Sequence, residues 1–395
     1  MSSKFLAQIE NEFLIRRIIN ASIISSGNVN STFKIEADGA NYILQKINKF
    51  VFKKPEEVMQ NIRRVSRFLE KKVLREGGNP QREVLHPINT LDGKRFFIDD
   101  NGQYWRMYDL IEGAVTYDTI SNTEMFYKVG KAFGKFQNRL ADYDTSTLHE
   151  AIPDFHNTPK RFTDFQIAML TDKVGRLKAI AGQRNHPLKK AIDYILSQEA
   201  ELRLLEVGKL SGKLPIRVTH NDTKINNVMI DQETGEPICI IDLDTIGPDT
   251  CLVDFGDAIR SGANRAGEEP ENLTDAKIDL NLFRAYTEGY LSQTLSIDSK
   301  GQINQEPQKG LVESEIKLLH KAPKILALEF AMRFIGDYLN GDEYFKLKDG
   351  QPEDINLRRG LAQMYLAQDM ASKEEEMKHI VDSIITEKIK SKEGR

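Results

Sequence analysis

The stretch His220-Asn221-Asp222-Thr223-Lys224-Ile225-Asn226-Asn227 is the most informative part of this chain. A short apolar strand is expected just before it, and a second apolar run, residues 238–241, leads directly to Asp242. A carboxylate at the end of a buried strand is unfavourable unless it is paired or bound to a cation. The pattern therefore favours a site built on Asp222, Asn227 and Asp242. A purely structural turn is the alternative, and it is disfavoured because three polar ligand types coincide with a strand-end carboxylate.

These three side chains suit phosphoryl transfer. Asp222 can accept the proton of an attacking hydroxyl, and Asn227 and Asp242 supply the hard oxygen ligands that Mg2+ prefers. In such a reaction Mg2+ bridges the phosphate oxygens of ATP. The sequence therefore predicts that ATP and Mg2+ are the cofactors, and that positioning and charge neutralisation do most of the catalysis.

The spacing His220-x-Asp222-x-x-x-x-Asn227, followed by Ile241-Asp242, resembles the aminoglycoside phosphotransferase and choline kinase families, and the resemblance covers residues 25–344. It implies a small-molecule kinase whose acceptor is a hydroxyl. An aminoglycoside or choline-type amino-alcohol kinase and a nucleotide-binding pseudokinase are the alternatives to a sugar kinase. Further features are most similar to the bacterial N-acetylhexosamine 1-kinase group and imply transfer to the anomeric hydroxyl of such a sugar: Ile241-Asp242-Leu243-Asp244-Thr245, Asp254-Phe255-Gly256-Asp257 and Arg333-Phe334-Ile335-Gly336-Asp337-Tyr338.

The resemblance implies an α+β, bilobal, protein-kinase-like fold. A small antiparallel sheet with a helix forms the N-terminal lobe, and the C-terminal lobe is larger and mostly helical. We expect a nucleotide-binding lobe at 1–110 and a catalytic and substrate lobe at 111–395. The patterns agree, because strands and turns dominate before Gly113 and helical periodicity dominates after it. Strands are predicted at 21–25, 31–36 and 41–47, and helices from Pro55 and at 124–142, 189–207, 279–294, 313–339 and 354–390.

Three polar residues around the central motif are assigned supporting roles. By resemblance, His220 supports the loop rather than reacting. Asp254-Phe255-Gly256 spells the metal-binding motif of protein kinases, but it lies too far beyond Asp222, so the metal is assigned to Asp242. Asp254 is expected to cap the following helix or to brace the loop. Asp244 points to the same side of an extended chain as Asp242, and both a second metal ligand and a supporting role stay open for it.

The nucleotide side rests on a turn and a strand. Ser26, Gly27 and Asn28 lie between two strands and resemble a phosphate-covering loop, since glycine permits close backbone approach and short polar side chains can donate to phosphate. An ordinary hairpin turn is the alternative. The third strand carries Gln45 where the family usually has Lys or Arg, with Lys46 next to it. Adjacent strand residues face opposite sides, so only one of the two can reach the phosphates unless the strand carries a bulge.

Residues 109–111 are the expected connector between the lobes, and residues 333–344 are the expected contact with the acceptor. By resemblance, the carbonyl of Asp109 and the N–H of Ile111 would meet the adenine edge, with a plain strand end as the alternative. Arg333 and Asp337 are four residues apart on a helix, so an ion pair between them is one expectation. The other is that Arg333 and Tyr344 face a polyhydroxylated substrate.

The bulk properties limit the partners. The formal net charge is -4, and no strong basic field points to nucleic acid. Two cysteines need no disulfide framework. We find no secretory signal and no apolar stretch long enough to span a bilayer. The expectation is a cytoplasmic monomer or weak homodimer that binds a small-molecule acceptor, expected to be a sugar, without nucleic acid or membrane. A protein kinase is disfavoured, because no activation segment is recognisable.

Overall fold

The computed structural model describes residues 1–24 and 29–393. Two compact units are each assembled from separate segments of the chain. The strand-rich unit comprises residues 1–116, 143–153 and 227–248, and the helical unit comprises residues 117–142, 154–226 and 249–395. The expected division into lobes 1–110 and 111–395 stays a prediction.

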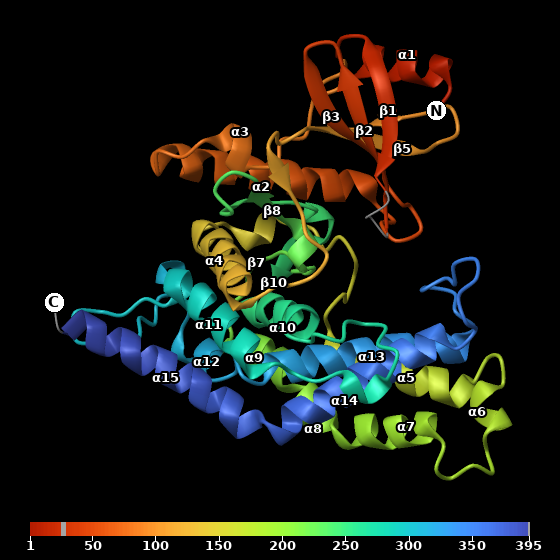
Figure 1. The fold of residues 1–395 in the computed structure, drawn as a ribbon, viewed down its shortest axis with the longest axis vertical. Coiled ribbons are helices and arrows are strands. Elements are labelled where there is room, and N and C mark those ends of the chain that lie inside the picture. The colour runs from red at the N-terminus through yellow and green to blue at the C-terminus, as the bar shows by residue number, and fades with distance from the viewer. Residues whose placement is uncertain (25–28, 394–395) are drawn as a thin grey trace. The chain divides into compact units, whose positions relative to one another are not determined.

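The strand-rich unit is built on a five-stranded antiparallel sheet with the order β1-β2-β3-β5-β4. Figure 1 shows these strands side by side with helix α1 (Ser3–Glu12) beside them. A turn at Asp38-Gly39 joins β2 and β3, because Ala37 pairs directly with Ala40 and Gly39 supplies a positive φ of 87°. The strands are β1 (Ile18–Ile24), β2 (Ser31–Ala37), β3 (Ala40–Lys46), β4 (Phe97–Ile98) and β5 (Tyr104–Asp109).

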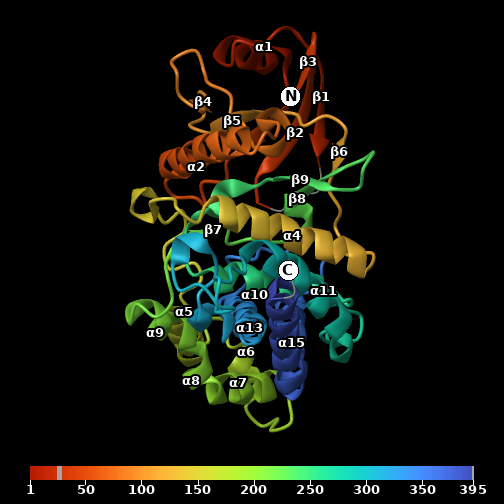
Figure 2. The ribbon, with the colours of Figure 1, turned by 90° about the vertical axis from the view of Figure 1, so that its left-hand side faces the viewer.

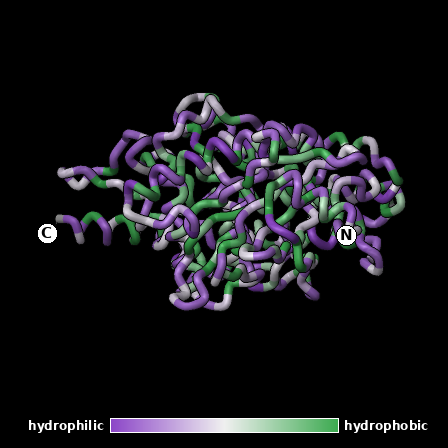
Figure 3. Tube along the Cα trace, turned by 90° about the horizontal axis from the view of Figure 1, so that it is seen from above, coloured by the Kyte–Doolittle hydropathy of each residue, from purple (hydrophilic) through white to green (hydrophobic). Residues whose placement is uncertain are grey.

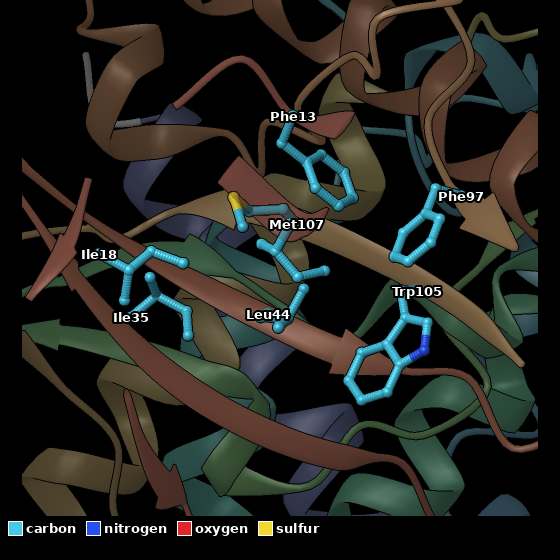
Figure 4. Close-up of a cluster of buried hydrophobic side chains, with 8 residues drawn as sticks. Phe13, Ile18, Ile35, Leu44, Phe97, Trp105 and Met107 are labelled. Carbon is cyan, nitrogen blue, oxygen red and sulfur yellow. The ribbon is translucent and has the colours of Figure 1, made fainter. Parts of the chain in front are cut away.

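One face of this sheet carries an apolar core. Alternate residues of a strand point to opposite faces, so Trp105 and Met107 of β5 face the core while Arg106 and Tyr108 face the other side. Burying each large apolar side chain contributes about 1.5–3 kcal/mol, so this face holds the sheet against α1. Figure 4 shows most of the cluster, which consists of Ile9, Phe13, Ile18, Ile35, Leu44, Phe97, Trp105 and Met107.

Helix α2 (Pro55–Arg75) begins at Pro55 as predicted and buries an apolar stripe that includes Val58, Ile62 and Val65. Its buried Asn61 donates to the carbonyls of His149 (2.7 Å) and Ile246 (3.0 Å). The other elements wholly within this unit are α3 (Pro80–Glu83), β6 (Ala114–Val115), η1 (Thr145–Thr147), β8 (Val228–Asp231), β9 (Pro237–Ile240) and η3 (Leu243–Thr245).

Two helix packings organise the helical unit (Figure 2). Helix α4 (Thr123–Arg139) packs on α11 (Leu280–Thr294) so closely that a Cβ atom at Gly130 would lie 2.3 Å from the carbonyl oxygen of Tyr286. Glycine is therefore required at that crossing. Helix α13 (Ala322–Asn340) packs against α5 (Thr158–Thr171), α10 (Cys251–Gly262) and α14 (Ile355–Ser372).

Three long helices predicted from the sequence are interrupted. Residues 189–207 fall into three helices, residues 313–339 into two because a new helix begins at Ala322 with Pro323 in its first turn, and residues 354–390 into two that break near Lys373. Polar and apolar segments alternate along α15, which ends near the C-terminus (Figure 3). The remaining elements are α6 (Arg176–Ala179), α7 (Pro187–Ser197), α8 (Glu199–Leu202), α9 (Leu204–Leu210), β7 (Arg217–Thr219), η2 (Ile225–Asn227), β10 (Gly247–Asp249), η4 (Leu273–Asp275), η5 (Pro307–Lys309), α12 (Glu313–Ile316) and α15 (Glu374–Glu393).

Across residues 1–24 and 29–393, no helix combines the length and the apolar character needed to cross a membrane.

Candidate active site

In the helical unit, two buried carboxylates of α10 hold the backbone of the central motif. The carboxylate of Asp254 accepts the N–H of His220 at 2.9 Å and the N–H of Asn221 at 2.8 Å. Thr223 donates its N–H to Asp257 at 3.1 Å and its hydroxyl to the carbonyl of Asp254 at 2.6 Å. The first turns of α10 therefore anchor the loop on both sides of Asp222, and they leave the Asp222 carboxylate outside this set of bonds.

Asp222 itself is accessible. Its side chain is 28% exposed, and the Nζ atom of Lys224 lies 2.9 Å from its Oδ1 atom. Burial opposes ionisation, but the positive charge of Lys224, with His220 and Arg260, outweighs it and holds the pKa of Asp222 below its ordinary value. The side chain is thus an ionised acceptor with a cation beside it. No role was predicted for Lys224 from the sequence, although its position two residues after Asp222 could have indicated an ion pair with that carboxylate.

His220 is fully buried and packs edge-on against two rings of α4, with centroid distances of 5.9 Å to Phe133 and 6.2 Å to Phe136. Its Nδ1 atom accepts the N–H of Asp222 at 3.3 Å. These contacts fit a residue that shapes the loop, which is the role that the family resemblance implies for it.

Asp254 combines burial with a shifted pKa. Burial raises the pKa of its carboxyl to about 6, and the neighbouring His220 and the two backbone amides oppose that shift only in part. The ionised form accepts both amides, so the loop depends on a carboxylate that titrates near neutral pH. Asp254 thus lies against the loop backbone and accepts its amides, as expected for a residue that braces the loop.

In the strand-rich unit, the β8–β9 hairpin brings two predicted metal ligands to one end. Val228 pairs with Ile240, and the N–H of Ile241 donates to the carbonyl of Asn227 at 2.9 Å. Asp242 follows directly, exposed and with a positive φ of 58°. An amide oxygen and a carboxylate at this end fit Mg2+, which takes oxygen ligands and keeps several waters.

Asp244, by contrast, is buried and fully engaged. Its Oδ1 atom lies 2.5 Å from Nη1 of Arg106, and its Oδ2 atom accepts the side-chain amide of Asn30 at 2.6 Å. Both oxygens therefore bind side chains of this unit, which favours the supporting role over the second metal ligand.

Arg106 was missed by the sequence reasoning. It is 1% exposed, and its Nε and Nη2 atoms donate to Oε1 of Gln45 at 3.0 and 2.8 Å. The register pairs Gln45 with Arg106 and Lys46 with Trp105. Gln45 and Arg106 therefore share one face of the sheet, and Lys46 lies on the opposite face. The signal was a charged residue between Trp105 and Met107 in an apolar strand.

The residues predicted to meet the adenine, Asp109 and Ile111, lie at and just beyond the end of β5. Asp109 ends β5, and the N–H of Leu110 donates to the carbonyl of Asn41 at 3.1 Å, so strand pairing continues one residue further. Ile111 follows and is buried. Ser26, Gly27 and Asn28 lie outside the described residues.

On the acceptor side, the expected ion pair between Arg333 and Asp337 is wrong. The carboxylate of Asp337 instead accepts the N–H groups of Tyr344 (2.9 Å) and Phe345 (2.8 Å), because the turn after α13 presents unsatisfied amides to it. The guanidinium of Arg333 lies among aromatic rings, 4.9 Å from the centroid of Phe155 and 5.8 Å from that of Tyr344.

The sheet of the strand-rich unit and the anchored Asp222 loop of the helical unit together define a kinase-like enzyme. Residues 20–291 match the model of the phosphotransferase enzyme family, so the chain belongs to that family. This confirms the broader resemblance inferred from the sequence and makes the protein a phosphotransferase with a hydroxyl acceptor.

Solved structures of kinases cover nearly the whole chain. A microcompartment-associated aminopropanol kinase has a TM-score of 0.56 at 14% identity, covering 94% of this chain and 98% of its own. An aminoglycoside phosphotransferase from Alicyclobacillus acidocaldarius has 0.56 at 12%, covering 96% and 97%. A spectinomycin phosphotransferase in complex with ADP and spectinomycin has 0.51 at 14%, covering 95% and 98%. These likenesses confirm the predicted α+β kinase-like fold.

Proposed function

We propose that this phosphotransferase moves the γ-phosphate of ATP to a hydroxyl of a small neutral acceptor, the anomeric hydroxyl of an N-acetylhexosamine or a related sugar. The observation that carries the proposal is the arrangement around Asp222. Backbone groups on both sides of it are anchored to Asp254 and Asp257, while its own carboxylate stays 28% exposed and ionised beside Lys224.

The residues divide the chemistry. Asp222 orients the acceptor hydroxyl and takes its proton, for which a low pKa keeps it unprotonated. Lys224 lies on the same carboxylate and adds positive charge where phosphoryl oxygens would approach. Asn227 and Asp242 would hold Mg2+, which when bound neutralises charge on the transferred phosphoryl group. His220 shapes the loop by packing against α4 and accepting the N–H of Asp222.

Arg106 is proposed to replace the cation that the family usually carries at the position of Gln45. Three observations support this: the two side chains share a face, Arg106 binds Gln45 directly, and Arg106 also fixes Asp244, two residues beyond Asp242. The cation that contacts the nucleotide phosphates would then be the guanidinium of Arg106 on β5, which also binds Gln45 on β3 and Asp244 after β9. Ser26, Gly27, Asn28, Asp109 and Ile111 stay predicted contacts of the nucleotide.

Charge supports a neutral acceptor over an amino-alcohol. Arg333 is a fixed cation that would repel an ammonium group, whereas a guanidinium and aromatic rings suit the hydroxyls and apolar faces of a sugar. Tyr344, 42% exposed, offers such a ring. The similarity to the aminopropanol kinase structure favours the amino-alcohol alternative, so both classes enter the test.

The test is an acceptor panel with coupled ADP detection. N-acetylhexosamines, simple hexoses, amino-alcohols, choline and aminoglycosides are compared at equal concentration with Mg-ATP. We expect ADP release with an N-acetylhexosamine and a product phosphorylated at the anomeric carbon. Asp222→Asn should lower kcat by about 10²–10⁴-fold, the usual contribution of a general base, with nucleotide binding retained.

Three results would contradict parts of this proposal. Turnover only with amino-alcohols or aminoglycosides would reject the sugar assignment. Mg-ATP that raises the Tm without any ADP release would indicate the pseudokinase alternative. Unchanged kcat in the Asp222→Asn variant would remove Asp222 from its role.

A further inference from the structure

A buried histidine contacts the backbone next to Asp222, and a buried glutamate pairs with that histidine. The side chains of His156 and Glu329 are 1% and 0% exposed, and Nδ1 of His156 lies 3.0 Å from Oε1 of Glu329. The other ring nitrogen, Nε2, lies 3.1 Å from the backbone carbonyl oxygen of Asn221. His156 comes just before α5 and Glu329 lies in α13, so the ring connects two helices to the residue that precedes Asp222.

The two partners of this ring determine its protonation. A backbone carbonyl has no hydrogen to donate, and an ionised carboxylate has none either. Both ring nitrogens must therefore carry hydrogen, which makes His156 an imidazolium paired with the Glu329 carboxylate. Burial alone would lower the pKa of His156, but the charge and the hydrogen bond of Glu329 outweigh burial and raise that pKa above its ordinary value.

The peptide units around Asn221 are thereby held from two directions. The N–H of Asn221 donates to Asp254 at 2.8 Å, and its carbonyl accepts from His156. Asn221 has a φ of +64°, a left-handed conformation that asparagine adopts more readily than most residues, and the bonds to Asp254 and His156 hold it there. Rotation of this backbone would displace Asp222, the next residue.

We propose that His156 and Glu329 are positioning residues for the base: the imidazolium fixes the Asn221 carbonyl, and Glu329 fixes the imidazolium. The proposal rests on the proposed role of Asp222. Arg333 belongs to the same arrangement, since its Nη1 atom lies 3.8 Å from the Glu329 oxygen that pairs with His156. The acceptor-side helix α13 is thus coupled to the catalytic loop through one carboxylate.

The charged groups that act on this pair come from several elements. Arg333 lies on α13, Arg161 on α5, Asp254 and Asp257 on α10, and Asp249 just before α10. The carboxylates favour the imidazolium, and the two arginines favour ionised Glu329. These charges favour the ionised pair, and His156 loses its proton when the pH rises above the raised pKa.

The experiment compares three substitutions in the full-length protein. His156→Phe keeps a ring and removes both donors. His156→Gln with Glu329→Gln removes both charges but keeps an amide donor near the Nε2 position. We expect the kcat of His156→Phe to fall about 100-fold, as for a misplacement of about 1 Å, with the KM for ATP within about twofold. The double variant should recover at least a tenth of the wild-type kcat and should lose the alkaline limb of the pH profile.

A matched control is His320→Gln, which changes another buried histidine of the helical unit. Its kcat should match the wild type. If His156→Phe retains wild-type kcat, or if the double variant recovers Tm but no kcat, the positioning role is rejected and a purely structural pair remains.

Two readouts are independent of turnover, so they separate this proposal from the choice of base and acceptor. Nitrogen NMR near pH 6.5, the ordinary pKa of histidine, should find both ring nitrogens of His156 mainly protonated in the wild type and one in Glu329→Gln. Amide hydrogen exchange in residues 220–224 should speed up at least tenfold in His156→Phe. A neutral His156 in the wild type, or unchanged exchange, would overturn the proposal even if Asp222 proves to be the base.

Discussion

The two units hold their functional segments with buried carboxylates of different kinds. In the strand-rich unit, Asp244 is held by side chains, the guanidinium of Arg106 and the amide of Asn30. In the helical unit, Asp254 is held by backbone, the N–H groups of His220 and Asn221. In both units the carboxylate proposed for the chemistry, the exposed Asp242 or the partly exposed Asp222, lies close in sequence to the braced segment. The two units should therefore be sensitive to different changes. Asp244 should be disrupted by loss of its cationic partner, and Asp254 should be disrupted by protonation of its carboxylate.

The largest effect is expected at Arg106. Arg106→Met leaves the buried Asp244 without its cation, and breaking one partner of a buried pair destabilises a protein by about 3–5 kcal/mol. The double variant Arg106→Met with Asp244→Asn should recover most of that free energy of unfolding, measured by chemical denaturation. If Arg106 also clamps the nucleotide, the KM for ATP should stay raised in the double variant.

The two measurements separate structure from function. Recovery of both stability and KM would make Arg106 a structural residue only, and the clamp would have to be sought elsewhere. A loss below about 1 kcal/mol in the single variant, typical of exposed ion pairs, would contradict the buried pair itself.

The next effect concerns pH and Asp254. Because folding raises the pKa of this carboxyl to about 6, the free energy of unfolding should fall as the pH rises from the unfolded value through 6. Activity should change in the opposite direction, since only the carboxylate accepts both loop amides. We expect kcat to fall below pH 6. Asp254→Asn should remove that acid limb and lower the plateau by about 5- to 150-fold, equivalent to about 1–3 kcal/mol for an amide left without its acceptor.

The matched comparison is Asp244→Asn, which neutralises the brace of the other unit. It should change stability and leave the acid limb of kcat near pH 6 in place. An acid limb that survives in Asp254→Asn would assign the titration to another group.

The sequence was sufficient for the features that depend on local pattern. The predicted strands at 31–36 and 41–47 correspond to β2 and β3 of the sheet, and the spacing from His220 to Asn227 predicts the central loop. Features that depend on long-range register were not predictable. Nothing near Arg106 in the chain indicates that Gln45 and Asp244 are its partners, because one lies on a neighbouring strand and the other follows β9.

The acceptor side illustrates the same limit. The four-residue spacing of Arg333 and Asp337 predicts an ion pair, but the turn at Tyr344 and Phe345 presents two amides to Asp337. The polar Glu329 within the apolar helix α13 was a visible signal, whereas its partner His156 lies 173 residues away in the sequence. Partners outside the four-residue helical spacing, some nearby in a turn and some distant in the chain, decide these contacts, and only the folded structure reveals them.

The smallest effect, and the one that decides the acceptor class, is expected at Arg333. For a neutral sugar, Arg333→Met should raise the acceptor KM about tenfold, the equivalent of one hydrogen bond at about 1.4 kcal/mol. For a cationic amino-alcohol, removing the like charge should lower the acceptor KM instead. Arg203→Met, which removes a surface guanidinium paired with Glu199 in the same unit, is the control for net charge and should leave the acceptor KM unchanged. The direction of the change, measured with saturating Mg-ATP, distinguishes the two classes, and an equal shift in the control variant would show that net charge rather than Arg333 is responsible.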